Sequence, residues 1–352
     1  MEDNKKKIES KEFLNKTVLI TGATSGIGKA CALFYLNEGA KVIMSGRDEK
    51  TLKDIGEKFP EQAITVKMDL SIDMQVYDLK SSVIETTGGA DIIINCAGVM
   101  FDADSEKCFP QDYDYTIDVN LRSSFLMFRL FKEFLKPGVS IINVSCLYGS
   151  RPCQGCAGYA VSKAGVEALT RFAAAELAEI GVRVNCVTAC PVDTNCYRFV
   201  GVSELEYSQI KERISNNIPM QRMANPEDIV RAIVFLSSNK RSGKITGQIL
   251  KVDGGRSLTS SGYTPWKGSR IMNSRFEPTG VIGSLFGDMY KKFFKKEEVV
   301  VGFPTKDDEI DKYFNESNWA TKSSDAHEKV MASYKNIEQN DVYLKKKYVD
   351  KK

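Results

Sequence analysis

Short apolar segments rich in β-branched residues alternate along this chain with longer segments whose apolar residues recur at helical spacing. Strands are predicted at residues 17–20, 41–45, 63–68, 90–94 and 141–145. After the first strand, Ile27, Cys31 and Phe34 recur every three or four residues, which is the period of one helix face. Further helices are predicted around residues 120–135 and from residue 159. Strands that alternate with helices in this way predict an α/β fold with a doubly wound parallel sheet.

The first predicted strand runs directly into a turn of glycines and small residues. The turn reads Thr21-Gly22-Ala23-Thr24-Ser25-Gly26-Ile27-Gly28, and a predicted helix follows it. Glycines between a buried strand and a helix let the backbone approach a pyrophosphate at the positive end of the helix. Strand, turn and helix in this order therefore predict a dinucleotide-binding site.

The end of the second predicted strand bears on which dinucleotide is bound. An acidic residue here would accept hydrogen bonds from a ribose 2′-hydroxyl and repel a 2′-phosphate. This chain has Gly46 and then Arg47, and a guanidinium binds phosphate well. The pattern favours NADP(H) over NAD(H). Asp48 and the lack of a basic residue within the glycine turn weigh against it, and an exposed turn arginine is the alternative interpretation of Arg47.

Tyr159 and Lys163 stand four residues apart, after a loop rich in glycine and cysteine. On a helix they lie one turn apart on the same face. A nearby ammonium favours the phenolate, which suits Tyr159 to act as a general acid/base. Many helices contain this spacing by chance, so a packed tyrosine with a solvated lysine is the alternative. The position behind a nucleotide-binding turn favours the catalytic interpretation.

With these motifs, residues 13–258 resemble the short-chain dehydrogenase/reductases, in the branch that forms one Rossmann-type domain. Other motifs of that family follow in order: Asp69, Asn95-Cys96-Ala97-Gly98 in place of the usual Asn-Asn-Ala-Gly, Asn120, Val184-Asn185, and Thr246-Gly247-Gln248 before Asp253-Gly254-Gly255. The resemblance implies an NADP(H)-dependent enzyme that interconverts a small-molecule carbonyl and a secondary alcohol by hydride transfer.

The resemblance also implies roles for particular residues. Tyr159 would exchange a proton with the carbonyl oxygen, and Lys163 would hold the nicotinamide ribose. Asn120 would support a water chain to Lys163, and Asp69 would contact the adenine. The implied cofactor-binding residues are Gly22, Thr24, Ser25, Gly26, Ile27, Gly28, Arg47, Asp69, Leu70, Asn95, Ala97, Gly98, Tyr159, Lys163, Val192 and Thr194. No metal ligands are predicted.

Two positions depart from the family pattern. Thirteen residues before the tyrosine the family normally has a serine that hydrogen-bonds the substrate carbonyl, but this chain has Cys146, and a thiol is a weak donor. Ser145 is not expected to replace it, because neighbours on a strand point to opposite faces. Further on, the usual Pro-Gly reads Ala189-Cys190, with Pro191 displaced by one, although Thr194 is in place. These departures support a second hypothesis: a weakly active or inactive dehydrogenase-fold subunit of a larger assembly.

Cysteines and apolar residues gather in the segments that would border the substrate. Six of the nine cysteines are Cys146, Cys153, Cys156, Cys186, Cys190 and Cys196, and the fold would bring them to one rim. Cys153-x-x-Cys156 has metal or redox spacing, but the single histidine, His327, is far away in sequence. One interpretation is that these cysteines are small buried residues with free thiols. The other is that oxidation of the thiols alters the binding of cofactor or substrate. Residues 194–223 include Tyr197, Phe199, Val200, Val202, Leu205 and Tyr207, which favours an apolar substrate or, alternatively, a packed helix.

Composition narrows the class of protein. A hydrophobic content of 42% and a charged content of 27% are those of a globular protein. The net charge of +3 lies entirely in residues 261–352, which contain 17 Lys and Arg against 14 Asp and Glu, so no broad basic surface for nucleic acid is predicted. No apolar run approaches the ~18 residues of a spanning helix. A charged segment at residues 1–12 and nine cysteines predict a cytoplasmic protein with free thiols.

Residues 261–352 form a predicted extension beyond the family domain, which is assigned to residues 13–260. A mostly helical or irregular structure is expected, with an amphipathic helix at 281–294, a polar stretch at 305–328 and a second helix at 328–348. Flanking lysines would suit a membrane surface, but Glu297 and Glu298 favour docking on the chain's own domain or on a protein partner. Dimers and tetramers are common in the family, so a homo-oligomer is expected.

Overall fold

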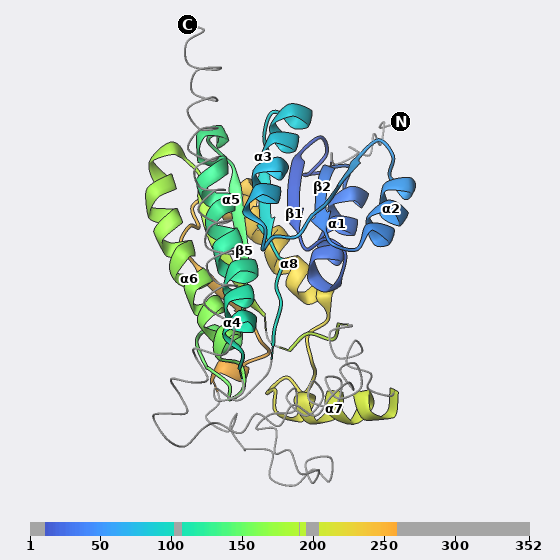
Figure 1. Cartoon of the computed structure of the whole chain (residues 1–352), viewed down its shortest axis with the longest axis vertical. Helices are drawn as coiled ribbons and strands as arrows, with labels where there is room; N and C mark the ends of the chain where they lie inside the picture. The colour runs from blue at the N-terminus through green and yellow to red at the C-terminus, as the bar shows by residue number, and fades with distance from the viewer. Residues whose placement is uncertain (1–10, 102–107, 190, 195–203, 259–352) are drawn as a thin grey trace, which may run out of the picture. The chain divides into compact units, whose positions relative to one another are not determined.

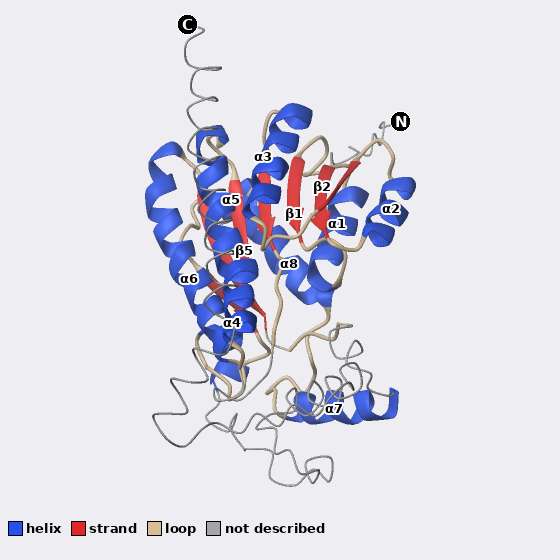
Figure 2. Ribbon diagram, in the orientation of Figure 1, coloured by secondary structure: helices blue, strands red, loops and turns tan. Residues whose placement is uncertain are grey.

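Seven parallel strands form one sheet in this computed structural model, which describes residues 11–101, 108–189, 191–194 and 204–258. The strands are β1 (Thr17–Thr21), β2 (Lys41–Gly46), β3 (Ala63–Lys67), β4 (Ile92–Asn95), β5 (Ser140–Cys146), β6 (Arg183–Ala189) and β7 (Ile249–Val252). Their order in the sheet is β3-β2-β1-β4-β5-β6-β7, and Figure 2 shows the sheet between its helices. The predicted doubly wound parallel sheet is confirmed. The order reverses between β1 and β4, which is where ligands bind in open α/β sheets.

Helices cover both faces of this sheet (Figure 1). One face packs against α1 (Gly26–Asn37), α2 (Glu49–Lys58) and α8 (Pro226–Ser237). The other packs against α3 (Asp73–Thr87), α5 (Ser123–Phe131) and α6 (Ala157–Leu177). The remaining α-helices of the described residues are α4 (Pro110–Ile117), α7 (Glu204–Asn216) and the short α9 (Asn239–Ser242).

Each central strand divides its side chains between two hydrophobic cores. In β1, Val18 and Ile20 belong to the core beneath α1 and α8, whereas Leu19 belongs to the core beneath α3 and α5. Ile92 and Ile93 of β4 divide in the same way. Successive side chains of a strand point to opposite faces, so a sheet covered on both faces needs apolar residues at every position. The continuous apolar runs of the sequence follow from this requirement.

The helix predicted around residues 120–135 is longer and less regular than expected. It begins at Pro110 with α4, continues through a π-helical turn, η1 (Asp118–Arg122), and passes through α5 into a 3₁₀ turn, η2 (Lys132–Phe134). Single π turns inside α-helices are frequent at functional sites, and Asn120 lies in this one. The helix of Tyr159 likewise begins two residues earlier than predicted, at Ala157.

Several predictions lie outside the described residues. They concern the N-terminal segment through residue 10, Cys190, residues 195–203 of the segment expected to cover the substrate, and all of residues 259–352. The division into a family domain and an extension therefore stays a prediction. Within the described ranges, no helix combines the length and the apolar character needed to cross a membrane.

Candidate active site

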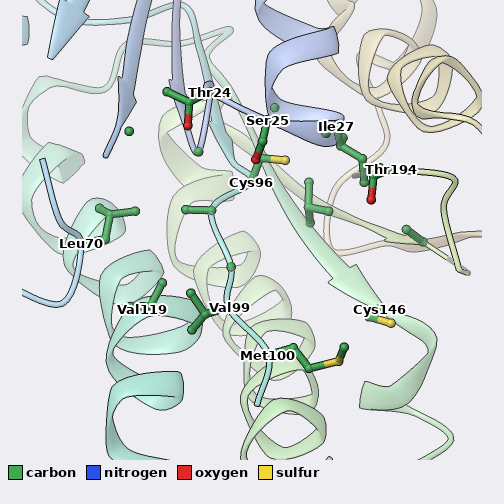
Figure 3. A pocket seen from close by; sticks show the side chains of 18 of the residues that line it. Thr24, Ser25, Ile27, Leu70, Cys96, Val99, Met100, Val119, Cys146 and Thr194 are labelled. Carbon is green, nitrogen blue, oxygen red and sulfur yellow. The ribbon is translucent and has the colours of Figure 1, made fainter. Parts of the chain in front are cut away.

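A cavity of about 400 Å³ opens at the carboxyl ends of the strands, beside the switch point between β1 and β4. Its volume is in the range of small-molecule sites. Figure 3 shows the glycine turn with Thr24 and Ser25 on one side of it, and Cys146 and Met100 farther along. The predicted site residues that line it are Gly22, Thr24, Ser25, Gly26, Ile27, Gly28, Arg47, Asp69, Leu70, Ala97, Gly98, Cys146, Tyr159, Lys163, Val192 and Thr194. Asn95 and Asn120 are the two predicted residues that do not line it.

The glycine turn packs so closely that side chains would not fit. A Cβ on Gly28 would lie 2.2 Å from the carbonyl oxygen of Gly22. Gly22 itself has a φ of +69°, and a Cβ there would lie 2.7 Å from the Cα of Ala97. Both obstacles are backbone atoms, which cannot rotate away as a flexible side chain could. The turn therefore needs glycine at both positions for steric reasons alone.

The N-terminus of α1 at this turn is suited to an anion. Ser25 caps the helix without a side-chain hydrogen bond to it, and the first turn contains no acidic residue. Helix N-termini combine backbone N–H donors with a partial positive charge. Nearby, the hydroxyl of Ser45 is buried at the cavity wall and has no hydrogen-bond partner among the described residues. The pyrophosphate and ribose groups of a dinucleotide fit this site, which offers the glycine turn, the N-terminus of α1 and the unsatisfied hydroxyl of Ser45.

Arg47 and Asp69 meet at the ends of β2 and β3 through a tyrosine that the sequence analysis missed. Nη1 of Arg47 donates to the hydroxyl of Tyr115 at 2.8 Å, and that hydroxyl lies 3.5 Å from Oδ2 of Asp69. Burial raises the pKa of the Tyr115 hydroxyl, so Tyr115 is neutral and bridges a cation and an anion. Arg47 is exposed at the mouth of the cavity. No local pattern marks Tyr115, because it comes from α4, 68 positions further on.

Lys163 is buried beside Tyr159 rather than solvated, so the alternative of a solvated lysine is wrong. It is 4% exposed, and its Nζ donates to the carbonyl oxygen of Val144 at 2.9 Å. Nζ also lies 5.7 Å from the centre of the Tyr159 ring. Burial lowers the pKa of the Lys163 ammonium, an effect that the neighbouring Cys146 opposes. A cation held in place by the backbone thus stands next to the phenol.

Asn120 lies directly behind the cavity wall. Its side chain donates to the carbonyl oxygen of Val99 at 2.9 Å and accepts from the Val99 N–H at 2.8 Å. It also donates to Oγ of Ser162 in α6 at 2.9 Å. A Cβ on Gly98 would lie 3.4 Å from both Oδ1 of Asn120 and Nζ of Lys163. Asn120 therefore holds the cavity-lining residues Gly98 and Val99 against α6, close to Lys163. Its predicted role in a water chain stays a prediction.

Asn95 does not line the cavity, and its side chain hydrogen-bonds to a neighbour in β5. Its Nδ2 donates to Oδ1 of Asn143 at 2.8 Å. The next two residues, Cys96 and Ala97, line the cavity. Their N–H groups donate to the hydroxyl oxygen of Thr21 at 3.1 and 3.3 Å. The contribution of Asn95 to this site is thus to position the end of β4, and a contact with a cofactor stays a prediction.

Cys146 and Ser145 point to opposite sides of β5, as expected from strand geometry. Oγ of Ser145 lies 3.2 Å from the carbonyl oxygen of Lys163 and 3.2 Å from Oε1 of Glu167, both in α6. Both residues are among those that line the cavity, but it is the thiol of Cys146 that is hydrogen-bonded with the side chain of Tyr159. Burial raises the pKa of the Cys146 thiol. The Ser145 hydroxyl is thus engaged with α6, and the expectation that it does not take the place of Cys146 toward a substrate stays a prediction.

The loop after β6 returns to the cavity despite its altered sequence. Val192 forms a parallel bridge with Ala224 just before α8. Thr194 lies against the glycine turn, where a Cβ on Gly26 would be 3.4 Å from its methyl carbon. Pro191 lines the cavity as well. The displaced proline has therefore not removed Thr194 from the site.

Within the described part of the covering segment, α7 packs on the Cys146 end of the site. Tyr207 is buried in a small cluster with Leu147, Ile218 and Met223, against which Cys146 also packs. Leu205, in contrast, is 71% exposed. For Tyr207, the alternative interpretation of a packed helix is the correct one.

Comparison with known proteins identifies this arrangement. A family model described as Enoyl-(Acyl carrier protein) reductase matches residues 22–257. The chain belongs to the short-chain dehydrogenase/reductase family. The match spans nearly all of the predicted range, residues 13–258. Short-chain dehydrogenase/reductases bind nicotinamide cofactors and carry out oxidoreduction between carbonyls and alcohols.

Individual relatives cover this domain almost end to end. The 3-oxoacyl-(acyl-carrier-protein) reductase FabG of Rickettsia prowazekii is 35% identical over 246 residues, which are 69% of this chain and 98% of the relative. The glucose 1-dehydrogenase of Gluconobacter oxydans is 33% identical over 262 residues, 72% of this chain and 96% of the relative. The solved ligand-free aldohexose dehydrogenase of Thermoplasma acidophilum matches with a TM-score of 0.65 and 26% identity, over 72% of this chain and 99% of that one. More than a quarter of this short-chain dehydrogenase/reductase lies outside each match.

Proposed function

We propose that this protein is an NADP(H)-dependent oxidoreductase that interconverts a carbonyl and a secondary alcohol, with Tyr159 as the general acid/base. The observation that carries the proposal is the buried Lys163 beside Tyr159, on the same cavity as the glycine turn. Relatives named as 3-oxoacyl-(acyl-carrier-protein) reductases and as a glucose dehydrogenase support this type of substrate.

The proposed cofactor site runs along the strand ends. When bound, the nicotinamide cofactor supplies or accepts the hydride. The N-terminus of α1 binds its pyrophosphate, Asp69 and Leu70 face its adenine, and Lys163 holds its nicotinamide ribose. The other proposed contacts are those of Gly22, Thr24, Ser25, Gly26, Ile27, Gly28, Arg47, Asn95, Ala97, Gly98, Val192 and Thr194.

The protein's chemical contribution is the handling of one proton. Tyr159 donates its hydroxyl proton to the carbonyl oxygen during reduction and takes it back during oxidation. The Lys163 ammonium favours the tyrosinate, and it does so strongly because charges interact more strongly where water is excluded. Cys146 is the second polar group next to Tyr159. Because a thiol is a weak donor, it polarises the carbonyl less than a serine hydroxyl would.

Arg47 is proposed to select NADP(H) by binding the 2′-phosphate. In Arg47→Leu we expect NADPH to bind about 10- to 100-fold more weakly, because a hydrogen bond to a charged group contributes about 1.5–3 kcal/mol, while NADH binding stays nearly unchanged. Fluorescence titration of each purified protein with both nucleotides measures this. Lys53→Leu, which removes an exposed cation from α2, is the matched control. Tighter binding of NADH than of NADPH to the parent would contradict the cofactor assignment.

Cys146 favours a second candidate function, a dehydrogenase-fold subunit of a larger assembly whose chemistry is weak or lost and which attaches through residues 261–352. The variant Cys146→Ser separates the two functions. For the enzyme, we expect kcat on test carbonyls with NADPH to rise by up to about 10²-fold, because one well-placed donor contributes about 10²–10³ to kcat. Cys108→Ser, at a cysteine that does not line the cavity, serves as the control. Absence of nucleotide binding to both parent and variant would favour the assembly subunit.

The exposed faces of α5 and α6 support a homo-oligomer as part of this proposal. Phe125 of α5 is 42% exposed, and Val161 and Phe172 of α6 are 49% and 52% exposed. The Phe172 ring contacts Phe128 edge to face, with centroids 6.1 Å apart. We expect Phe172→Glu to lower the sedimentation coefficient to that of a monomer, and Phe235→Glu, on α8 at the opposite face of the sheet, to leave it unchanged. A monomeric parent would exclude this assembly.

A cytoplasmic location completes the proposal. None of the seven cysteines in the described ranges is in a disulfide, which suits a reducing compartment. Cell fractionation tests the location, and recovery in a secreted or organellar fraction would overturn it.

A further inference from the structure

The loop between β5 and α6 contains two cysteines that the proposed reaction does not use. Cys153 and Cys156 are the ends of a four-residue turn, in which the N–H of Cys156 donates to the carbonyl oxygen of Cys153 at 3.4 Å. Gly155, the third residue of the turn, has a φ of +80°, as a type II turn requires. Such turns hold their end Cα atoms within about 7 Å, and disulfides span about 4.4–6.8 Å between Cα atoms. The backbone therefore already holds the two Cα atoms at about the separation that a disulfide spans.

The two thiols differ in exposure, as an attacking and a resolving thiol do. Cys153 is half-buried, whereas Cys156 is 1% exposed at the start of α6. Hydrogen bonds from Cys156 and from Tyr148, together with the nearby Arg256 guanidinium, lower the pKa of the Cys153 thiol to about 7 against the effect of burial. These are the titratable and charged groups that act on the pKa of the Cys153 thiol. The described ranges contain no group of three or more His, Cys, Asp or Glu side chains that could hold a metal ion. We therefore interpret Cys153 and Cys156 as a redox pair.

Tyr148 connects the pair to the active site. Its side chain is hydrogen-bonded with Cys153, and it lines the cavity. Its ring contacts the ring of Tyr159 edge to face, with centroids 6.4 Å apart. A change at Cys153 therefore reaches the proposed general acid through one side chain.

We propose that Cys153 and Cys156 are a redox-active dithiol, which peroxides convert to a disulfide that alters the cavity wall at Tyr148. The Cys153 thiolate attacks one peroxide oxygen, so that an S–O bond forms, the O–O bond breaks and, with hydrogen peroxide, water leaves after protonation. The Cys156 sulfur then attacks the sulfenic sulfur, so that the S–S bond forms, the S–O bond breaks and a second water leaves. Two thiols and one hydrogen peroxide thus give one disulfide and two waters. The two electrons pass from sulfur to oxygen.

The disulfide removes the anionic acceptor of the Tyr148 hydrogen bond. A thiolate is a strong acceptor because it is charged, whereas the sulfur of a disulfide is neutral. Tyr148, whose ring contacts that of Tyr159, then loses this hydrogen bond. This consequence for catalysis rests on the proposed function, whereas formation of the disulfide does not.

The test treats the full-length protein with hydrogen peroxide and maps its cysteines by tandem mass spectrometry. We expect a link between Cys153 and Cys156 in the parent and in Cys108→Ser, and none in Cys153→Ser. Cys156→Ser is expected to stop at a sulfenic acid on Cys153, which dimedone traps. We also expect alkylation of Cys153 by iodoacetamide to accelerate through a midpoint near pH 7 in the parent. The absence of the link, or oxidation of Cys153→Ser at the parent's rate, would overturn the dithiol.

The effect on catalysis is measured separately. Where the reduced protein reduces test carbonyls with NADPH, we expect peroxide to lower kcat severalfold and dithiothreitol to restore it, with Cys153→Ser unaffected by either. A link that forms without any change in activity would overturn the connection through Tyr148. If the reduced protein fails to bind NADPH, the proposed function fails, and the mass measurement still decides on the dithiol.

Discussion

Replacing Tyr159 by phenylalanine is expected to lower kcat by about 10²–10⁴-fold, the range of a lost general acid/base. The variant keeps the ring that packs against Tyr148 and faces Nζ of Lys163, and loses only the hydroxyl that exchanges the proton. NADPH affinity should therefore stay close to that of the parent. Steady-state reduction of test carbonyls, together with fluorescence titration of NADPH, separates the loss of chemistry from a loss of binding.

The control for this variant is Tyr77→Phe, in α3. Tyr77 is also half-buried in a helix but does not line the cavity, so its variant should retain full activity. A Tyr159→Phe protein that keeps most of its kcat would show that another group transfers the proton. Equal losses of kcat and of NADPH binding would instead assign Tyr159 to cofactor binding.

Gly28→Ala is expected to have the largest effect on the cofactor site as a whole. The new Cβ would lie 2.2 Å from the Gly22 carbonyl oxygen, so the turn must move away from α1. Overpacking of this kind costs about 1–3 kcal/mol, and in a domain of this size each kcal/mol lowers Tm by about 2–4 °C. Because a displaced turn no longer presents its backbone to a pyrophosphate, we expect NADPH affinity to fall by more than about tenfold, a loss of about 1.4 kcal/mol.

Gly56→Ala provides a matched comparison within the same chain. Gly56 lies inside α2, and a Cβ there would meet only the Thr65 methyl at 3.5 Å, an ordinary contact. Alanine is favoured over glycine in helix interiors by about 0.5–1 kcal/mol, so this variant should be slightly more stable and bind NADPH normally. Thermal unfolding and nucleotide titration of both proteins make the comparison. Parent-like behaviour of Gly28→Ala would mean that the turn tolerates a side chain, against the close contact described above.

The sheet was predictable because its strands bury both faces. Val18, Leu19 and Ile20 fill two different cores. A strand that is covered on both faces needs apolar residues at successive positions, so it appears in the sequence as a continuous apolar run. The glycine turn was predictable for a similar reason, since only glycine fits where backbone meets backbone at Gly22 and Gly28. Both requirements act on residues that are adjacent in sequence, so both can be recognised from a short stretch of sequence.

Some missed features had a readable signal. Helix α8 was not predicted, although Asn225 and Asp228 form a capping box at its start and Pro226 occupies its first turn, which is a recognised sequence signature of a helix N-terminus. The π turn at Asn120 is different. A π turn holds one more residue than an α turn, and the spacing of the apolar residues along α4 and α5 does not reveal it.

The sequence by itself determined the fold class, the family and the segments that form the strand ends, because each rests on periodicity or on motifs of adjacent residues. Tertiary structure alone decided which side chains meet. It placed Tyr115 between Arg47 and Asp69, buried Lys163 that a helix pattern could equally have left in water, and set Tyr148 between Cys153 and Tyr159. The first two contacts depend on how helices pack on the sheet, and the third depends on the path of the loop between β5 and α6. No local pattern of residues encodes either.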